Sequence, residues 1–136
     1  MIELDLTPGA ELPPFVRETG FANWNRFAAV MDEFAAIHMD DEAGRAAGFA
    51  TAIGMGNLQW SYYHNLLRDW LAGSGRIDQI SVQYAQPNLK NTTLSARGKI
   101  AAVRQGPDGA QVVIDLWVED DNDRKLSSGQ ATVTVR

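Results

Sequence analysis

The stretch IGMGNLQWSYYHNLLRDWLAGSG, residues 53–75, sets the strongest constraint on the architecture. Gly54 and Gly56 precede a run without glycine or proline, and Gly73 and Gly75 close it. This punctuation predicts a helix between the two glycine pairs. Its apolar residues cover most of the circumference, so we expect the helix to be buried on several sides. They are Leu58, Trp60, Tyr62, Tyr63, Leu66, Leu67, Trp70 and Leu71.

Upstream of this stretch, the pattern predicts a strand and two shorter helices. Residues 1–14 contain Pro8-Gly9 and Pro13-Pro14 and are expected to form an extended lead-in, followed by a short strand over 15–20. An amphipathic helix follows from Phe21, because apolar residues recur at helical spacing. They are Trp24, Phe27, Ala28, Met31 and Phe34 or Ala35. Residues 40–47 predict a second short helix with acids in its first turn, which Gly48 ends.

Downstream of Gly75 the apolar period becomes two, which is typical of strands with one wet face. Turn signals at 106–109 and 120–123 separate the later segments. Four strands in this order predict an antiparallel meander. The alternating residues include Ile80, Val82 and Tyr84 in the first strand, and Leu94, Ala96, Gly98, Ile100 and Ala102 in the next.

The order of elements predicts an α+β chain, with residues 1–136 forming one domain. A single sheet wrapped around one buried helix is the hot-dog fold. One sheet leaves part of the helix and an edge strand uncovered. We therefore expect a dimer in which two sheets join edge to edge.

Composition excludes several classes of function. The chain is 45% hydrophobic and 21% charged, as in ordinary globular proteins, and it has no cysteine. A disulfide framework, a cysteine zinc site and a thiol nucleophile are therefore excluded. No metal site is expected, because the two histidines, His38 and His64, are far apart in the sequence. The start is not a signal peptide and no apolar run reaches about 18 residues, so we expect a cytoplasmic protein with no membrane contact.

The net charge of −5 argues against nucleic-acid binding, which needs a basic surface. It also disfavours an acidic protein partner, although a local basic patch can override the global sign. Four basic residues are close in sequence and either form such a patch or are scattered solubilising charges on strand faces. They are Lys90, Arg97, Lys99 and Arg104.

The segment DEFAAIHMDDEAGRAAGF, residues 32–49, places His38 just after an apolar segment, with acids on both sides. A solvated helix end has this appearance, and so does half of an active site. The other histidine, His64, lies inside the predicted buried helix and is expected to be a hydrogen-bonded core residue.

Residues 26–49, RFAAVMDEFAAIHMDDEAGRAAGF, followed by AIGMGNLQ at 52–59, resemble the hydratase motif of MaoC-like (R)-specific enoyl-CoA hydratases and hydroxyacyl-thioester dehydratases. The family pattern is Gly-Asp-x-Asn-Pro-(Ile/Leu)-His-x-Asp and, further on, Ile-Ala-His-Gly-Met. His38 takes the position of the family's catalytic histidine, and Glu33 that of its catalytic aspartate. Ala35 replaces the motif Asn, and Met55 stands where a histidine is usual.

The resemblance implies addition of water to an enoyl thioester, with coenzyme A as part of the substrate and no separate cofactor. We assign Glu33 as general base toward water and His38 as general acid toward C2. The Gly56 N–H, reinforced by the helix dipole, is the expected oxyanion donor. The residues expected to contact substrate are Asp40, Met55, Asn57, Trp60, Lys90 and Arg97.

Each assignment has a structural alternative. His38 is then a helix C-terminal histidine satisfied by the dipole, Glu33 a solvated acid, and Gly56 a helix start where backbones pack closely. The aromatic residues of the long helix belong to the core or a dimer interface first and to an acyl pocket second.

For the whole chain, the leading expectation is a hydratase or dehydratase working as a homodimer or as one subunit of a heterodimer of hot-dog chains. The acidic net charge favours coenzyme A over acyl carrier protein as the carrier. One alternative is a non-catalytic or half-active subunit of a heteromeric hydratase, which Ala35 and Met55 favour. A second is a hot-dog acyl-CoA thioesterase, against which the position of His38 speaks.

Overall fold

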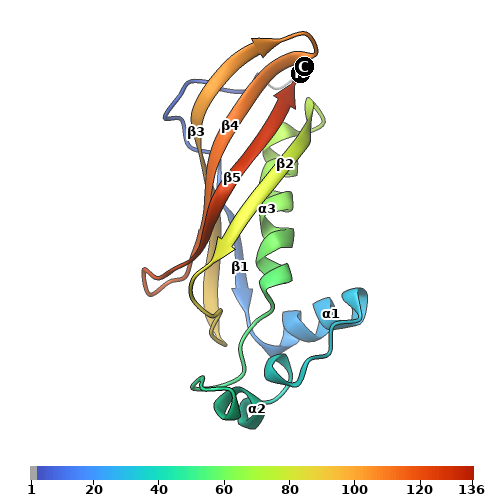
Figure 1. The fold of residues 1–136 in the computed structure, drawn as a ribbon, viewed down its shortest axis with the longest axis vertical. Helices are drawn as coiled ribbons and strands as arrows, with labels where there is room; N and C mark the ends of the chain where they lie inside the picture. The colour runs from blue at the N-terminus through green and yellow to red at the C-terminus, as the bar shows by residue number, and fades with distance from the viewer. Residues whose placement is uncertain (1–2) are drawn as a thin grey trace.

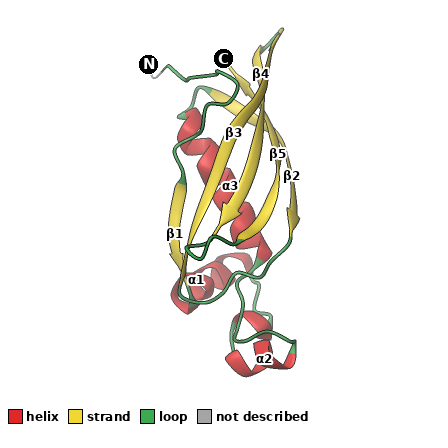
Figure 2. Cartoon of the chain, turned by 90° about the vertical axis from the view of Figure 1, so that its left-hand side faces the viewer, coloured by secondary structure: helices red, strands yellow, loops and turns green. Residues whose placement is uncertain are grey.

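The computed structural model describes residues 3–136 as one antiparallel sheet curled around a long helix (Figure 1). The sheet has five strands in the order β1-β3-β4-β5-β2. Figure 2 shows α3 lying along the concave side of the sheet, which is the predicted hot-dog arrangement. The elements are β1 Phe15–Thr19, α1 Phe21–Met31, η1 Ala36–His38 (a 3-10 turn), α2 Asp41–Ala46, α3 Gly56–Leu71, β2 Gly75–Tyr84, β3 Thr92–Gly106, β4 Gly109–Glu119 and β5 Lys125–Val135.

The predicted meander is correct for β3, β4 and β5 but wrong for β2. Strand β2 pairs with β5, from Gly75 opposite Val135 to Tyr84 opposite Ser127. On the side away from β4, β3 pairs with β1, with Phe15 opposite Ala96. A period of two identifies a strand but carries no information about its partner. The connection 85–91 therefore carries the chain across the sheet from β2 to β3.

The core lies between α3 and the inner face of the sheet. Alternate residues of β3 and β4 face the helix, and the register of β5 and β2 continues this alternation. One stripe of α3 faces the sheet, and its apolar members are nearly inaccessible to solvent. They are Leu58, Tyr62, Tyr63, Leu66, Leu67 and Leu71.

The prediction that α3 is buried on several sides is wrong for the single chain. Trp60 is 36% exposed, and His64 packs against it with ring centroids 5.5 Å apart. Both residues line an open hollow beside β2, together with Arg68. The sheet covers only one side of the helix, so an apolar residue on the other side stays accessible.

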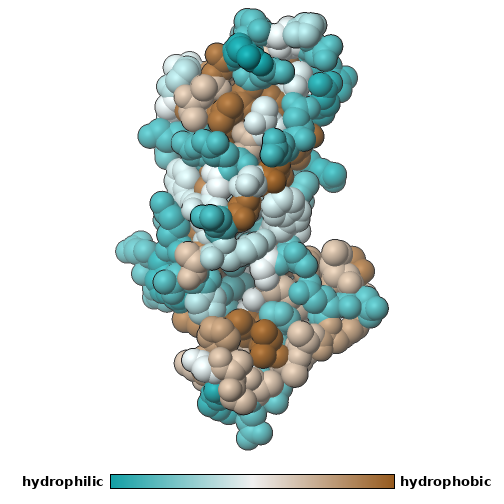
Figure 3. All heavy atoms as spheres, in the orientation of Figure 1, coloured by the Kyte–Doolittle hydropathy of each residue, from teal (hydrophilic) through white to brown (hydrophobic). Residues whose placement is uncertain are grey.

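Helix α1 ends earlier than its apolar spacing predicts. Asp32 adopts a left-handed conformation with φ 53°, and its N–H donates to Ala28. Phe34 and Ala35 therefore lie outside the helix, and Phe34 is 59% exposed. Figure 3 shows hydrophobic surface at this end of the molecule, over α1 and α2. Because α1 ends at Met31, Glu33 also lies outside the helix.

The remaining short elements follow the predictions. Strand β1 and helix α2 lie where expected, and Gly48 after α2 has φ 98°. The lead-in runs beside β3, where the Leu12 N–H donates to the Gly98 carbonyl at 2.9 Å. Residues 1 and 2 of the predicted lead-in lie outside the described residues. Within residues 3–136 no helix is both long and apolar enough to cross a membrane.

The buried stripe of α3 gives a direct test of the fold. Leu67 is 0% exposed, so Leu67→Ala removes core contacts and leaves a cavity. We expect a loss of about 2–5 kcal/mol in the free energy of unfolding, measured by urea denaturation. Asp69→Ala, two residues along on the exposed face, is the matched control and should change it by less than about 0.5 kcal/mol. Equal losses in the two variants would contradict this placement of the core.

Candidate active site

The peptide group of Ile53 orients His38. The Ile53 N–H donates to the Ile37 carbonyl at 2.9 Å, and the Ile53 carbonyl lies 2.7 Å from His38 Nδ1. A carbonyl oxygen only accepts hydrogen bonds, so Nδ1 carries a proton. The other ring nitrogen, Nε2, is left available for chemistry.

The structure brings Glu33 and His38 together, as their sequence spacing predicts. His38 Nε2 lies 4.0 Å from Glu33 Oε1. The imidazole is buried, whereas the Glu33 side chain is 29% exposed. The separation is too long for a direct hydrogen bond but is suited to a water that contacts both groups. The pair can therefore hold one water at the edge of solvent.

The first turn of α3 contacts the same carboxylate. Asn57 Nδ2 donates to Glu33 Oε2 at 3.3 Å. Gly56, the residue before it, begins α3, so its N–H lies outside the intrahelical ladder. Within residues 3–136 no acceptor pairs with this N–H. The start of α3 thus presents a free donor, at the positive end of the helix dipole, next to the carboxylate's amide partner.

A cleft of about 320 Å³ opens beside Gly56. Ile53 and Gly56 both line it, whereas Glu33 and His38 do not. The acid–imidazole pair adjoins the cleft through its hydrogen bonds: His38 binds the carbonyl of Ile53, which lines the cleft, and Glu33 binds Asn57, the residue after Gly56. The segment 53–57 is therefore shared by the cleft and the pair.

Tyr84, at the end of β2, covers part of this cleft. A Cβ built on Gly56 would lie 3.3 Å from Tyr84 Cζ, so the ring sits directly over the glycine. Tyr84 is 48% exposed and lines the cleft mouth. Partial burial raises the pKa of Tyr84, so the phenol keeps its proton at neutral pH. A larger residue at position 56 would push this ring outward.

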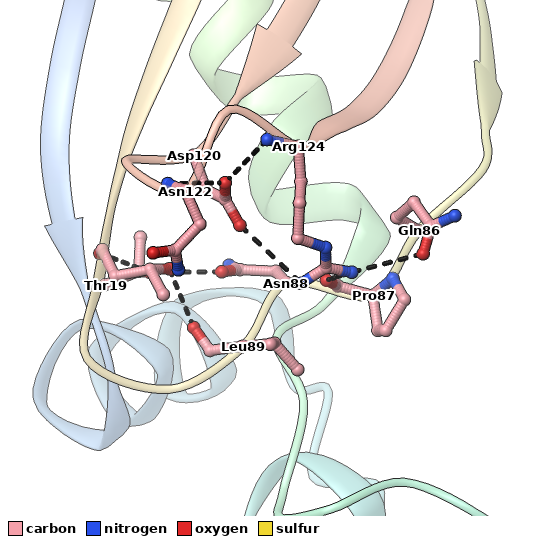
Figure 4. A network of polar contacts seen from close by, with 9 residues as sticks. Thr19, Gln86, Pro87, Asn88, Leu89, Asp120, Asn122 and Arg124 are labelled. Carbon is pink, nitrogen blue, oxygen red and sulfur yellow. Dashed lines mark hydrogen bonds and ion pairs between the residues drawn. The ribbon is translucent and has the colours of Figure 1, made fainter.

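The far wall of the cleft is the connection between β2 and β3, anchored by the turn between β4 and β5 (Figure 4). Asp120 Oδ1 accepts the N–H groups of Asn122 and Arg124 at 3.0 and 2.9 Å. Arg124 Nη2 donates to Gln86 Oε1 at 3.2 Å and contacts the Pro87 carbonyl at 3.5 Å. This network holds the wall in place from the opposite side of the cleft.

Lys90, in the connection between β2 and β3, binds α2 through Asp41. Its Nζ donates to both oxygens of Asp41, at 2.9 and 2.8 Å, and lies 4.7 Å from the Phe21 ring centroid. Asp41 Oδ1 also accepts the Ala52 N–H at 3.1 Å. The hydrogen bond from Lys90, with that from Ala52, lowers the pKa of Asp41 below its usual value of 3.8. Lys90 is thus already paired within the chain.

The other residues expected to contact substrate are dispersed. Met55 is fully buried, and Asp40 caps α2 by accepting the Glu42 N–H at 3.3 Å. Trp60 lines the hollow beside β2 and not the cleft. Arg97 pairs with Glu119 of β4. Of this set, only Asn57 is hydrogen-bonded to the acid–imidazole pair.

Of the two alternatives for the four basic residues, a patch and scattered charges, the structure does not form the patch as one cluster. Arg97 and Lys99 belong to the outward-facing residues of β3, and Arg104 follows beyond a bulge and contacts Gln111. Lys90 lies apart from them, on Asp41. Alternation along β3 puts Arg97, Lys99 and Arg104 on the outer face of the sheet. This placement favours scattered solubilising charges.

His64 is not the hydrogen-bonded core residue that its helix predicts. No described residue hydrogen-bonds its ring, which lies against Trp60 on the outer side of α3. Partial burial and nearby Arg68 lower the pKa of His64. Within residues 3–136 no cluster of three or more His, Cys, Asp or Glu could hold a metal ion.

Several residues of the site were missed at the level of sequence. Ile53 acts through its backbone and Tyr84 through its position over Gly56, and neither leaves a signal in the residue pattern. Gln59 did leave one, because it is a polar residue three positions after Gly56 on the buried side of α3. Asn88, buried in the cleft wall, follows a proline in an irregular segment and carries no period.

Comparison with known proteins finds a family model that matches the sequence. The MaoC like domain family matches residues 11–122. Among solved structures, the (R)-hydratase from A. caviae involved in PHA biosynthesis is 20% identical, with a TM-score of 0.85 over 96% of this chain and 97% of that chain. No curated protein matches the sequence.

Two heteromeric complexes from Mycobacterium tuberculosis are also similar in structure. A chain of the ChsH1-ChsH2 complex is 17% identical, with a TM-score of 0.84 over 96% of this chain and 98% of that chain. A chain of the HadBC (3R-hydroxyacyl-ACP dehydratase) complex is 15% identical, with a TM-score of 0.76 over 97% of this chain and 98% of that chain. At these identities the similarity establishes the fold.

The Asp41–Lys90 contact predicts a measurable titration. In Lys90→Met the pKa of Asp41 should rise toward 3.8, because the main cause of its lowering is removed. The stability that Asp41 contributes is present above pH 3.8 and is lost as pH falls through its lowered folded pKa. The measurement is the pH titration of the Asp41 carboxyl carbon by NMR. Arg45→Met is the matched control, since Arg45 is the smallest contributor. An equal rise in the control, or none in Lys90→Met, would contradict the assignment.

Proposed function

This chain belongs to the family of MaoC-like domains, and on that premise we propose that it is a hydratase that adds water reversibly to a 2-enoyl thioester of coenzyme A. The supporting observation is that Glu33 lies beside His38 and is hydrogen-bonded to the first turn of α3. A carboxylate and an imidazole 4.0 Å apart can hold one water molecule between them. The reverse reaction, dehydration of a 3-hydroxyacyl thioester, uses the same groups.

Each residue has one role in hydration. Glu33 takes a proton from the bridging water, whose oxygen bonds to C3 of the enoyl group. The electron pair of the double bond moves toward the thioester oxygen, where the Gly56 N–H stabilises the developing charge. His38, with both ring nitrogens protonated, gives the Nε2 proton to C2. The product is the 3-hydroxyacyl thioester, with no atom left over.

The proximity of the two side chains also lets each of them return to its starting protonation state. After one turnover Glu33 holds a proton and His38 Nε2 is free. A water between them, across 4.0 Å, can pass the proton from the carboxyl group to the imidazole. His38 Nδ1 keeps its bond to the Ile53 carbonyl throughout, so the ring does not need to turn.

The oxyanion donor is the largest single contribution that we assign to the backbone. A preorganised N–H at such a position is worth about 3 kcal/mol of transition-state stabilisation. Glycine at position 56 leaves room between α3 and the Tyr84 ring, because any Cβ there would meet the ring at 3.3 Å. A thioester oxygen must approach on the side that this ring leaves open.

Asn57 compensates for one departure from the family motif. Ala35 stands at the motif position where the resemblance expects an asparagine, and it has no side-chain amide to offer. Asn57 supplies an amide from the first turn of α3 and donates to Glu33 Oε2. The carboxylate is therefore held even though position 35 cannot contact it.

We further propose that the active form contains a second hot-dog chain. Strand β2 is an edge of the sheet, and the hollow beside it exposes Trp60. An unpaired edge beside accessible apolar surface favours pairing with another sheet. The similar ChsH1-ChsH2 and HadBC structures are complexes, which supports a partner chain for this protein.

A non-catalytic subunit of a heteromeric hydratase is the second candidate function. The observation in its favour is Met55, which is fully buried where the motif usually has histidine. A buried thioether neither donates nor accepts a proton in catalysis. In this alternative the partner chain supplies all of the chemistry.

Hydration of crotonyl-CoA, followed as loss of the enoyl absorbance, tests the proposal. Glu33→Gln keeps the shape of the side chain but cannot accept a proton. We expect at least a 100-fold loss of kcat, as for removal of a general base. His38→Ala should lose a similar factor.

Asp32→Asn is the matched control. It is the neighbouring acid, and asparagine tolerates the left-handed conformation at φ 53°. This variant should keep the wild-type rate. Full activity in Glu33→Gln would remove the proposed base. Release of free thiol would indicate a thioesterase. Turnover that needs a second hot-dog chain and keeps its rate in Glu33→Gln would favour the non-catalytic subunit.

A further inference from the structure

Gln59 is a polar residue in the stripe of α3 that packs against the sheet. It is only 2% exposed, and its neighbours on that stripe are Leu58, Tyr62 and Tyr63. A buried carboxamide is costly unless both of its ends find partners. Its two ends therefore need to be accounted for.

The oxygen end is satisfied by a chain of hydroxyl groups. Ser127 Oγ donates to Gln59 Oε1 at 2.6 Å, and Tyr63 Oη lies 2.7 Å from Ser127 Oγ. Burial raises the pKa of Tyr63 to about 12, so the phenol holds its proton and can donate to Ser127. Each hydroxyl has one proton, so the direction of donation is Tyr63 to Ser127 to Gln59.

The reverse direction leaves a buried proton without an acceptor. If the Gln59 amide were turned over, its nitrogen would donate to Ser127 and Ser127 would donate to Tyr63. The Tyr63 proton would then have no acceptor among residues 3–136. Leaving such a buried donor unpaired costs about 1–3 kcal/mol. The observed orientation, with Oε1 on Ser127, is therefore the stable one.

The nitrogen end of Gln59 remains free. Within residues 3–136 no group accepts a hydrogen bond from Nε2, and Gln59 lines the same cleft as Gly56. Residues three apart lie on one face of a helix, and side chains tilt toward the helix N-terminus. Gln59 and Gly56 thus bring two unpaired donors, the Nε2 amide and a backbone N–H, to one cleft.

The cleft is suited to a neutral acceptor. No side chain with a formal charge lines it. Its wall combines apolar groups with carboxamides, and the buried Asn88 Nδ2 is also without a partner. Hydrogen-bond donors in an apolar cleft without a cation select a carbonyl oxygen over an anion.

We propose that Gln59 is a second hydrogen-bond donor to the thioester oxygen, beside the Gly56 N–H, and that Ser127 and Tyr63 position it. The proposal rests on the proposed function, since it assigns the thioester carbonyl to this cleft. Gln59 would contact the substrate directly, whereas Ser127 and Tyr63 would act only through Gln59.

Two ligands that differ at the carbonyl test the proposal. Butyryl-CoA carries the thioester carbonyl, and S-butyl-CoA is the thioether without it. Wild-type protein should bind butyryl-CoA more tightly in calorimetric titrations. Gln59→Met, which keeps the length of the side chain but has no donor, should weaken butyryl-CoA binding about tenfold and leave S-butyl-CoA unchanged.

Two further variants separate positioning from folding. Ser127→Ala frees the Gln59 amide without removing it, so butyryl-CoA binding should weaken by a smaller factor and S-butyl-CoA binding should not change. Gln105→Met, an exposed glutamine near the β3–β4 turn, is the matched control and should affect neither ligand. Thermal melts by circular dichroism check that each variant is folded, and Gln59→Glu replaces Gln59→Met if the latter does not fold.

The outcomes are distinguishable. Equal weakening of both ligands in Gln59→Met would show a structural role and overturn the inference, as would unchanged binding of butyryl-CoA. Either result leaves the proposed hydratase intact if Glu33→Gln still abolishes hydration. Failure of wild-type protein to bind either ligand would overturn both the inference and the proposed function.

Discussion

The Ile53 peptide group is the constraint on which the site depends. Its carbonyl sets the tautomer of His38, and its N–H binds the Ile37 carbonyl in the turn that carries the histidine. Ile53 also forms a β-bridge with Leu89, and the next N–H, of Gly54, donates to the Asn88 carbonyl at 2.8 Å. One short extended segment therefore joins the histidine turn to the wall of the cleft. It leads directly into α3, so any shift of Ile53 would move all three parts.

The curl of the sheet supplies the other side of the site. Because inward-facing residues alternate, the last inward residue of β2 is Tyr84 and its partner on β5 is Ser127. These two side chains reach the first turns of α3, at Gly56 and Gln59 respectively. The donors at the start of α3 therefore lie next to the Tyr84 ring and the Ser127 hydroxyl of the sheet. Fold and site share the same register, and a one-residue slip of β5 would replace Ser127 by an outward residue.

Much of this arrangement could be predicted from the sequence, because it depends on local periodicity. The glycine pairs around 56–71, the helical spacing from Trp24 and the alternation in β3 each follow from residues close together in the chain. The partner of β2 could not be predicted, because a period of two identifies a strand without identifying the strand that it pairs with. The end of α1 depended on one left-handed residue, Asp32, which aspartate tolerates but does not require. The proximity of Glu33 and His38 could be predicted from their spacing in the sequence. The role of the Ile53 carbonyl could not, because every residue has a backbone carbonyl.

The central claim is that a thioester binds with its oxygen at the start of α3 and its double bond facing the acid–imidazole pair. The most direct test is a crystal structure of the Glu33→Gln variant with crotonyl-CoA bound. The account predicts the thioester oxygen within about 3 Å of the Gly56 nitrogen, with C3 on the side of residues 33 and 38. A thioester carbonyl directed away from Gly56, or C3 turned away from position 33 toward solvent, would contradict it.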